Sequence, residues 1–165
     1  MGLLPRKPVK RRRDGRYDIN LADLERQFIG SQLEQFRDLL RDHVDILFAN
    51  EAEICSLWQT ESFDAALQAT RGLCEVAALT RSAKGSLILA GEETHMVDAA
   101  PVERVVDTTG AGDLYAAGFL YGLTRELPLP ICGEIGSLCA AEIISHVGAR
   151  SETPLSRLVA EAGLV

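Results

Sequence analysis

A short glycine-containing segment reads Asp107-Thr108-Thr109-Gly110-Ala111-Gly112-Asp113. It follows a valine-rich run, residues 102–106, which predicts a β-strand, and it opens a run of small and apolar residues, 114–120, which predicts a helix. The first N–H groups of a helix have no intrahelical partners and carry partial positive charge. Glycines let the backbone approach a ligand closely. The segment therefore predicts an anion site at a helix start, with phosphate as the usual anion.

Asp113 adds a carboxylate beside this anion site, where it is placed to accept the proton of an attacking hydroxyl. The alternative is a tight turn with Asp113 as a helix cap or first-turn acid. A dinucleotide-binding loop requires a small residue where Tyr115 stands, and a P-loop requires a Gly-Lys pair that the sequence lacks. The two threonines and the second acid, Asp107, favour the phosphate site.

Composition fits a single α/β domain. The chain has 165 residues, of which 47% are hydrophobic and 25% charged, and no apolar run approaches the roughly 20 residues of a membrane span. Residues 1–16 hold seven of the 17 basic residues and one of the 24 acidic ones, so the rest of the chain is strongly acidic. We therefore expect a basic, disordered head over 1–18, a domain over 19–165, and no nucleic-acid or membrane partner.

The cysteines indicate a reduced, cytoplasmic protein. Cys55, Cys74, Cys132 and Cys139 form no Cys-x-x-Cys pair, and only three histidines are present, which argues against a zinc site. Each lies in a largely apolar context, which is typical of thiols in a protein core.

Strand and helix patterns alternate along the chain. Buried strands are predicted over 44–49, 76–80 and 86–90, with a hairpin partner over 94–97. Helices are predicted over 21–41, 50–57, 63–74 with Ser62 as N-cap, 114–126, 131–146 and 153–162. This order is typical of an α/β layered fold with a largely parallel sheet. Ligands bind at the carboxyl ends of such strands, and Asn50, Thr80 and Asp107 are each expected there.

Asn50 and Glu53 stand three residues apart at a predicted helix start. The spacing favours a capping box, in which Asn50 is the N-cap and Glu53 reaches back to its N–H group. An amide and a carboxylate could also hold a hydrated Mg²⁺ ion against nucleotide phosphates, and the two roles are compatible.

Residues 107–113, together with Ala116-Ala117-Gly118-Phe119, resemble the C-terminal signature of ribokinase-like (PfkB-type) carbohydrate and nucleoside kinases. The similarity extends over about 44–150, and segments 48–53 and 80–86 are most similar to bacterial adenosine kinases within this family. The resemblance implies a three-layer ribokinase-like fold. It also implies ATP-dependent transfer of phosphate to a hydroxyl of a nucleoside or sugar, with adenosine as the leading acceptor.

The resemblance also implies roles for individual residues. Asp113 matches the catalytic base, and the amides of Gly110, Ala111 and Gly112 match the anion hole. Asn50 and Glu53 match the residues that support Mg²⁺, while Asp107 and Thr109, with Gly148, match a site for a monovalent cation such as K⁺. The ATP-binding positions are Thr80, Ser82, Gly85 and Thr108, although the family more usually has glycine where this chain has Ser82.

Members of the family carry an additional N-terminal half that supplies strands, a lid and the acceptor-binding residues. Nothing in residues 1–43 matches it, so the fold is expected to be truncated on its N-terminal side. An uncovered sheet edge would favour homodimerisation. The alternative to an active kinase is therefore a truncated nucleotide-binding module without catalysis; a dinucleotide-binding domain is disfavoured by Tyr115.

Overall fold

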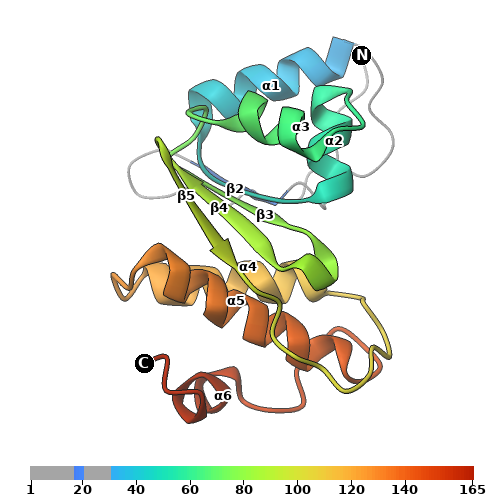
Figure 1. Ribbon diagram of the computed structural model, residues 1–165, viewed down its shortest axis with the longest axis vertical. Helices are drawn as coiled ribbons and strands as arrows, with labels where there is room; N and C mark the ends of the chain where they lie inside the picture. Colours follow the sequence, from blue (N-terminus) through green and yellow to red (C-terminus); the bar gives the residue numbers. More distant parts are fainter. Residues whose placement is uncertain (1–16, 21–30) are drawn as a thin grey trace.

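The computed structural model describes residues 17–20 and 31–165, which form one sheet with helices on both faces (Figure 1). In chain order the elements are β1 (Tyr17–Asn20), α1 (Ser31–His43), β2 (Val44–Asn50), α2 (Glu51–Trp58), α3 (Phe63–Thr70), β3 (Val76–Thr80), a 3₁₀ turn η2 (Ser82–Lys84), β4 (Ser86–Ala90), β5 (Glu93–Val97), α4 (Ala111–Leu123), α5 (Leu129–Ile144) and α6 (Leu155–Glu161). Among the described residues, no helix combines the length and apolar character needed to traverse a bilayer.

The sheet has five strands in the order β1-β2-β3-β4-β5. The first three run parallel, whereas β3 pairs with β4, and β4 with β5, in antiparallel fashion. Asn50 lies opposite Thr80, and Thr80 lies opposite Ser86. The last residues of β2 and β3 therefore lie beside the first residue of β4. They form the carboxyl end of the parallel strands, where ligands of parallel sheets bind.

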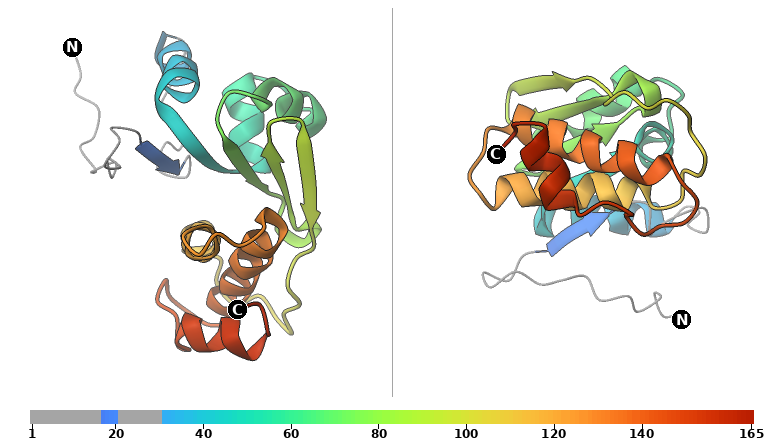
Figure 2. Two further views of the ribbon diagram at one scale, coloured as in Figure 1. Left: turned by 90° about the vertical axis from the view of Figure 1, so that its left-hand side faces the viewer. Right: turned by 90° about the horizontal axis from the view of Figure 1, so that it is seen from below.

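Alternate residues of β2 face different layers, which explains its continuous apolar run. Leu47 and Ala49 pack with helices α1, α2 and α3, while Ile46 and Phe48 pack with α4 and α5. Figure 2 shows the two helical layers on opposite sides of the sheet, with α6 lying outside α5. The edge-to-face contact between Phe48 and Phe119, with ring centroids 5.5 Å apart, joins β2 to α4. The predicted three-layer α/β fold is confirmed.

The predicted strand over residues 102–106 is wrong. This segment has no regular secondary structure, and its Val105 and Val106 side chains are exposed. The Val106 N–H group donates to the Ile144 carbonyl at 2.8 Å, at the end of α5, so the segment is bound to a helix and not to the sheet. Asp107 consequently does not follow a strand end.

Other boundaries shift by a few residues. The helix predicted over 21–41 is present from Ser31, and residues 21–30 lie outside the described chain. Tyr17 and Asp18, assigned to the basic head, belong to β1, and the rest of that head is not described. Helix α3 ends at Thr70, not at residue 74, and α5 already begins at Leu129, because Pro130 is tolerated in a first helical turn.

Candidate active site

Residues 107–113, the predicted anion-binding segment, lead directly into a helix, as their sequence predicts, although no strand precedes them. Helix α4 begins at Ala111, and its N-cap, Gly110, has φ +83°, in the left-handed region that glycine adopts without strain. A Cβ atom at Gly110 would lie 3.1 Å from the Cβ of Ala149, so a larger residue would also crowd the loop after α5. Helix starts offer such N–H groups to anions; here the Ala111 N–H group already donates to the Thr108 carbonyl, so an anion would compete with that bond or use the neighbouring amides.

Asp107 connects two loops. Its Oδ1 atom accepts a hydrogen bond from the Thr109 N–H group at 2.9 Å, and its Oδ2 atom accepts one from the Gly148 N–H group at 3.0 Å. Hydrogen bonds from the Thr109 hydroxyl and from these two N–H groups lower the pKa of Asp107. Asp107 is therefore an ionised brace between the anion-binding segment and the loop after α5.

Asp113 lies in the first turn of α4 and is exposed. A general base must be accessible to its substrate, so this position is compatible with the predicted role. Thr108 is also exposed, and its carbonyl accepts a hydrogen bond from the Ala111 N–H group at 3.2 Å. A Cβ atom at Gly112 would meet nothing within 4 Å, so open space adjoins the helix start.

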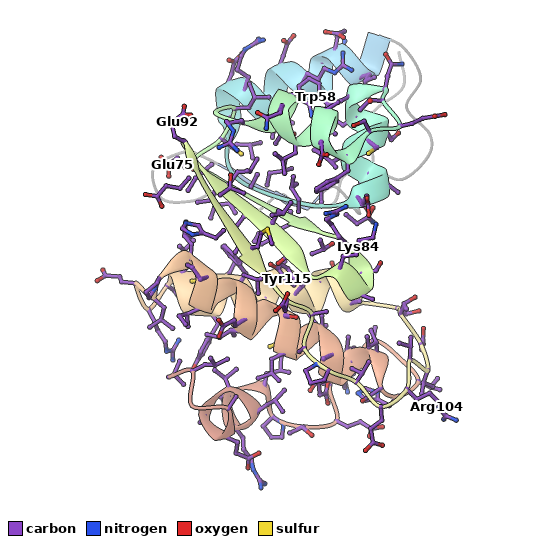
Figure 3. All side chains as sticks on the ribbon, viewed as in Figure 1. Trp58, Glu75, Lys84, Glu92, Arg104 and Tyr115 are labelled. Atoms are coloured by element: carbon purple, nitrogen blue, oxygen red, sulfur yellow. The ribbon has the colours of Figure 1, made fainter. Side chains whose placement is uncertain are left out.

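Tyr115 fixes α4 against the start of β4, beside the carboxyl ends of β2 and β3. Its hydroxyl donates to the Ser86 Oγ atom at 2.7 Å, and the side chain lies between the sheet and the helices below it (Figure 3). Burial raises the pKa of Tyr115 to about 12. Because Ser86 lies opposite Thr80, and Thr80 opposite Asn50, this bond brings the anion-binding helix to the edge that carries the other predicted residues.

Asn50 and Glu53 form the predicted capping box at the start of α2. The Glu53 N–H group donates to Asn50 Oδ1 at 2.9 Å, and the Asn50 N–H group donates to Glu53 Oε2 at 2.8 Å. In the described part of the chain, no group of three or more His, Cys, Asp or Glu side chains is arranged to hold a metal ion. A site with one carboxylate and an amide still fits Mg²⁺, which retains waters and shares phosphate oxygens.

The predicted ATP-binding turn lies beside this capping box. Ser82 has φ +52°, which accounts for the glycine that the resemblance led us to expect there. Gly85 has φ +78°, and a Cβ atom on it would lie only 2.0 Å from the Val97 carbonyl oxygen, so only glycine fits. The Thr80 hydroxyl donates to the Ala49 carbonyl at 3.5 Å, which links the ends of β2 and β3.

Sequence reasoning missed the charged contacts around Glu51. Its carboxylate pairs with Arg81 at 3.3 Å and with Lys84 at 3.8 Å, and the Arg81 guanidinium lies 4.1 Å from the centroid of the Phe63 ring. These contacts hold the turn 81–85 against the starts of α2 and α3.

The four cysteines are free thiols; Cys132 and Cys139 are buried, whereas Cys55 and Cys74 are half-buried.

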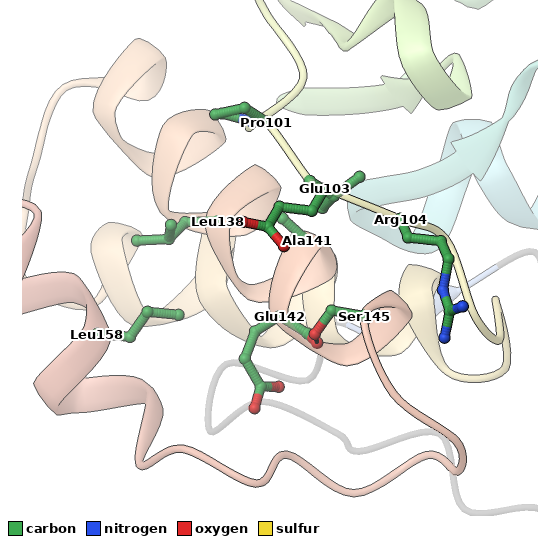
Figure 4. A pocket seen from close by; sticks show the side chains of 9 residues that line it. Pro101, Glu103, Arg104, Leu138, Ala141, Glu142, Ser145 and Leu158 are labelled. Atoms are coloured by element: carbon green, nitrogen blue, oxygen red, sulfur yellow. Dashed lines mark hydrogen bonds between the residues drawn. The ribbon is translucent and has the colours of Figure 1, made fainter.

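Two cavities lie away from the anion-binding segment. One, of about 690 Å³, is formed by residues 101–104, by α5 and by Leu158 of α6 (Figure 4). The other, of about 300 Å³, lies at the amino ends of β2 and β3. Neither is lined by residues 107–113. Gly112 and Asp113, in the first turn of α4, are exposed.

The fold and this segment define an α/β protein with a glycine-containing loop at the start of a helix. Residues 10–155 match the model of the pfkB family of carbohydrate kinases, and the chain belongs to that family.

Kinases of known sequence and solved structure are similar to this chain. A cytidine kinase from Thermococcus kodakarensis is 36% identical over 118 residues, which cover 68% of this chain and 42% of that protein. The crystal structure of adenosine kinase from Sinorhizobium meliloti aligns with a TM-score of 0.76 and 44% identity, over 79% of this chain and 40% of that one. Ribokinase from Arabidopsis thaliana, complexed with ribose and ATP, aligns with a TM-score of 0.65 and 27% identity, over 74% of this chain and 43% of that one. The chain thus spans less than half the length of each.

Proposed function

We propose that this chain is the nucleotide-binding and phosphoryl-transfer part of an ATP-dependent kinase that phosphorylates a hydroxyl of a nucleoside or sugar. The observation that carries the proposal is the brace formed by Asp107, which holds the Thr109 and Gly148 N–H groups beside the start of α4. Transfer of a phosphoryl group depends on positioning and on neutralising spreading negative charge. Oriented amides at a helix start supply that stabilisation without reorganising.

In this proposal Asp113 accepts the proton of the attacking hydroxyl, and the amides of Gly110, Ala111 and Gly112 stabilise the transferred group. ATP is bound by Thr108 and by the turn that contains Thr80, Ser82 and Gly85. Asn50 and Glu53 support Mg²⁺, which would neutralise phosphate charge. Asp107 and Thr109 contribute to a K⁺ site.

A nucleotide is favoured over a simple phosphate by the surface beside the brace. Val106 and Val147 are 38% and 79% exposed, and they directly precede Asp107 and Gly148, which are hydrogen-bonded to each other. Exposed apolar side chains next to an anion site suit a ligand with both a charged and an aromatic part. Adenosine is the acceptor we favour, because the Sinorhizobium structure is 44% identical to this chain.

The test is conversion of ATP to ADP with a panel of nucleosides and sugars. We expect Asp113→Asn to lower kcat by about 10²–10⁴-fold, the range typical of a lost general base. Asp64→Asn is the matched control, because Asp64 is also an exposed first-turn acid, in α3. Full activity of the Asp113 variant would overturn the assignment of the base.

A second candidate is nucleotide binding without transfer. It is favoured by the exposure of Gly112 and Asp113 at the start of α4, since an acceptor normally lies in an enclosed site. Binding of ATP by this chain with no phosphorylated product from any acceptor would support this candidate over the kinase.

A further inference from the structure

The loop between α5 and α6 is held by carboxylates. Three main-chain N–H groups in residues 147–153 donate hydrogen bonds to described residues: that of Gly148 goes to Asp107, and those of Glu152 and Thr153 go to Glu142. The loop has no helical or strand hydrogen bonds of its own. Its conformation therefore depends on these two acidic side chains.

Glu142 is built into the protein. It lies in the last turn of α5, its side chain is only 9% exposed, and its Oε1 atom accepts from the Glu152 and Thr153 N–H groups at 2.8 and 2.9 Å. His146 Nε2 lies 3.4 Å from the same oxygen. Burial raises the pKa of Glu142, but the hydrogen bonds that it accepts from the loop lower the pKa by more, so the net shift is downward and the carboxylate is ionised.

Glu142 does not face the larger cavity, although it contributes to the cavity wall. In Figure 4 its carboxylate points away from Pro101 and Glu103, toward the segment that joins α5 to α6. A buried carboxylate with two main-chain donors costs more to disturb than an exposed one, because each lost bond leaves a group without its partner. Glu142 therefore stabilises the loop between α5 and α6 and does not line a ligand pocket with its carboxylate.

The other end of the same loop contacts the anion-binding segment. Gly148 donates to Asp107, and Ala149 packs against Gly110, the N-cap of α4. Glu142 and Asp107 therefore hold opposite ends of residues 148–153, and one of these ends touches the amides at the start of α4.

We propose that Glu142 is a positioning residue for the anion site: by fixing residues 152–153 it holds Gly148 and Ala149 where they brace Asp107 and Gly110. This inference rests on the proposed function, since the anion is taken to be the transferred phosphoryl group. Glu142 touches no ligand in this role and acts through Asp107.

The test compares Glu142→Ala and Glu142→Gln with Glu134→Ala, an exposed acid on the same helix. The first measurement is amide hydrogen exchange of Thr109 and Gly148 in the chain without ligand. We expect exchange to become about tenfold faster in Glu142→Ala, corresponding to ~1.4 kcal/mol. Glu142→Gln, which keeps an acceptor oxygen, should restore part of the protection, and Glu134→Ala should change nothing.

The second measurement is the affinity for ADP with Mg²⁺, with and without aluminium fluoride as a mimic of the transferred group. We expect Glu142→Ala to lose about tenfold in affinity for the mimic, while affinity for ADP changes less than about twofold. Unchanged exchange at Thr109 and Gly148 overturns the proposal, as does faster exchange throughout the chain, which would mean a general structural role. If Glu142→Ala does not fold, Glu142→Gln decides by the same criteria.

The two proposals fail separately. If the wild-type chain binds neither ADP nor the mimic, the proposed function is refuted, whereas the exchange of Thr109 and Gly148 still shows whether Glu142 controls the brace.

Discussion

The buried pair of Tyr115 and Ser86 makes a prediction that can be measured without any ligand. The two side chains are 4% and 3% exposed, and their oxygens are 2.7 Å apart. Tyr115→Phe keeps the ring but leaves the Ser86 hydroxyl buried without its donor. We expect the free energy of unfolding at pH 7 to fall by about 1–3 kcal/mol.

The same pair gives this difference a pH dependence. Burial raises the pKa of Tyr115 from 10.0 to about 12, so the folded state favours the protonated phenol. This contribution to stability is fully present below pH 10, the ordinary value, and is lost as pH rises through 12. The loss amounts to about 1.4 kcal/mol per pH unit between these values. Phenylalanine has no proton to lose, so the stability gap between the two proteins should close, or reverse, by pH 12.

Urea unfolding at a series of pH values from 7 to 11.5, with linear extrapolation, measures the gap. Other groups also titrate over this range, but they are common to both proteins and cancel in the difference. Tyr121→Phe is the control on the same helix, because the Tyr121 ring contacts Arg125 and remains in the variant. A gap between wild type and Tyr115→Phe that stays constant from pH 9 to pH 11.5 would refute the account of a buried, protonated phenol.

Three further predictions concern the backbone and its caps. Gly85→Ala should cost about 3 kcal/mol or more, because its Cβ atom would collide with the Val97 carbonyl, whereas Gly72→Ala, with φ +75° and open space, should cost about 1–2 kcal/mol; equal midpoints in urea would contradict this. Asn50→Ala should lower stability by about 1 kcal/mol through loss of the α2 cap, and an unchanged melting curve would show that the capping box is not stabilising. The lowered pKa of Asp107 contributes stability above about pH 3.8 that is lost as pH falls through the folded-state value; Asp107→Asn should lack this acid-dependent loss, and identical acid titrations would exclude the brace.

The sheet and most helices could be predicted because their signals are local. The apolar run of β2 is followed directly by the capping box of α2. Both patterns involve residues close together in the sequence, so they can be recognised without knowledge of the rest of the fold. The resemblance implied a role for Gly85 in ATP binding, and the structure shows why a glycine stands there, since a side chain would collide with the Val97 carbonyl.

The failures concern long-range contacts. Residues 102–106 have the valine content of a strand. Composition alone does not reveal that this segment does not pair with β5, the last strand of the sheet. Glu142 carried a signal that we did not use, since it is a lone acid within the apolar run 138–144. A charge at such a place is buried only if it is paired, and its partners, ten and eleven residues further on, could not be named from spacing.

Because no strand precedes Asp107, the position of the proposed anion site depends on helix α5. Residues 98–106 are held to α5 at both ends: the Ala100 N–H group donates to the Ser137 Oγ atom at 2.7 Å, and the Val106 N–H group donates to the Ile144 carbonyl at 2.8 Å. Helix α5 also carries Glu142, which fixes the loop on the other side of Asp107. One helix therefore sets the position of both segments that contact the start of α4. It follows that a change at the end of α5 should displace the proposed anion site while leaving the sheet, and the capping box at Asn50, intact.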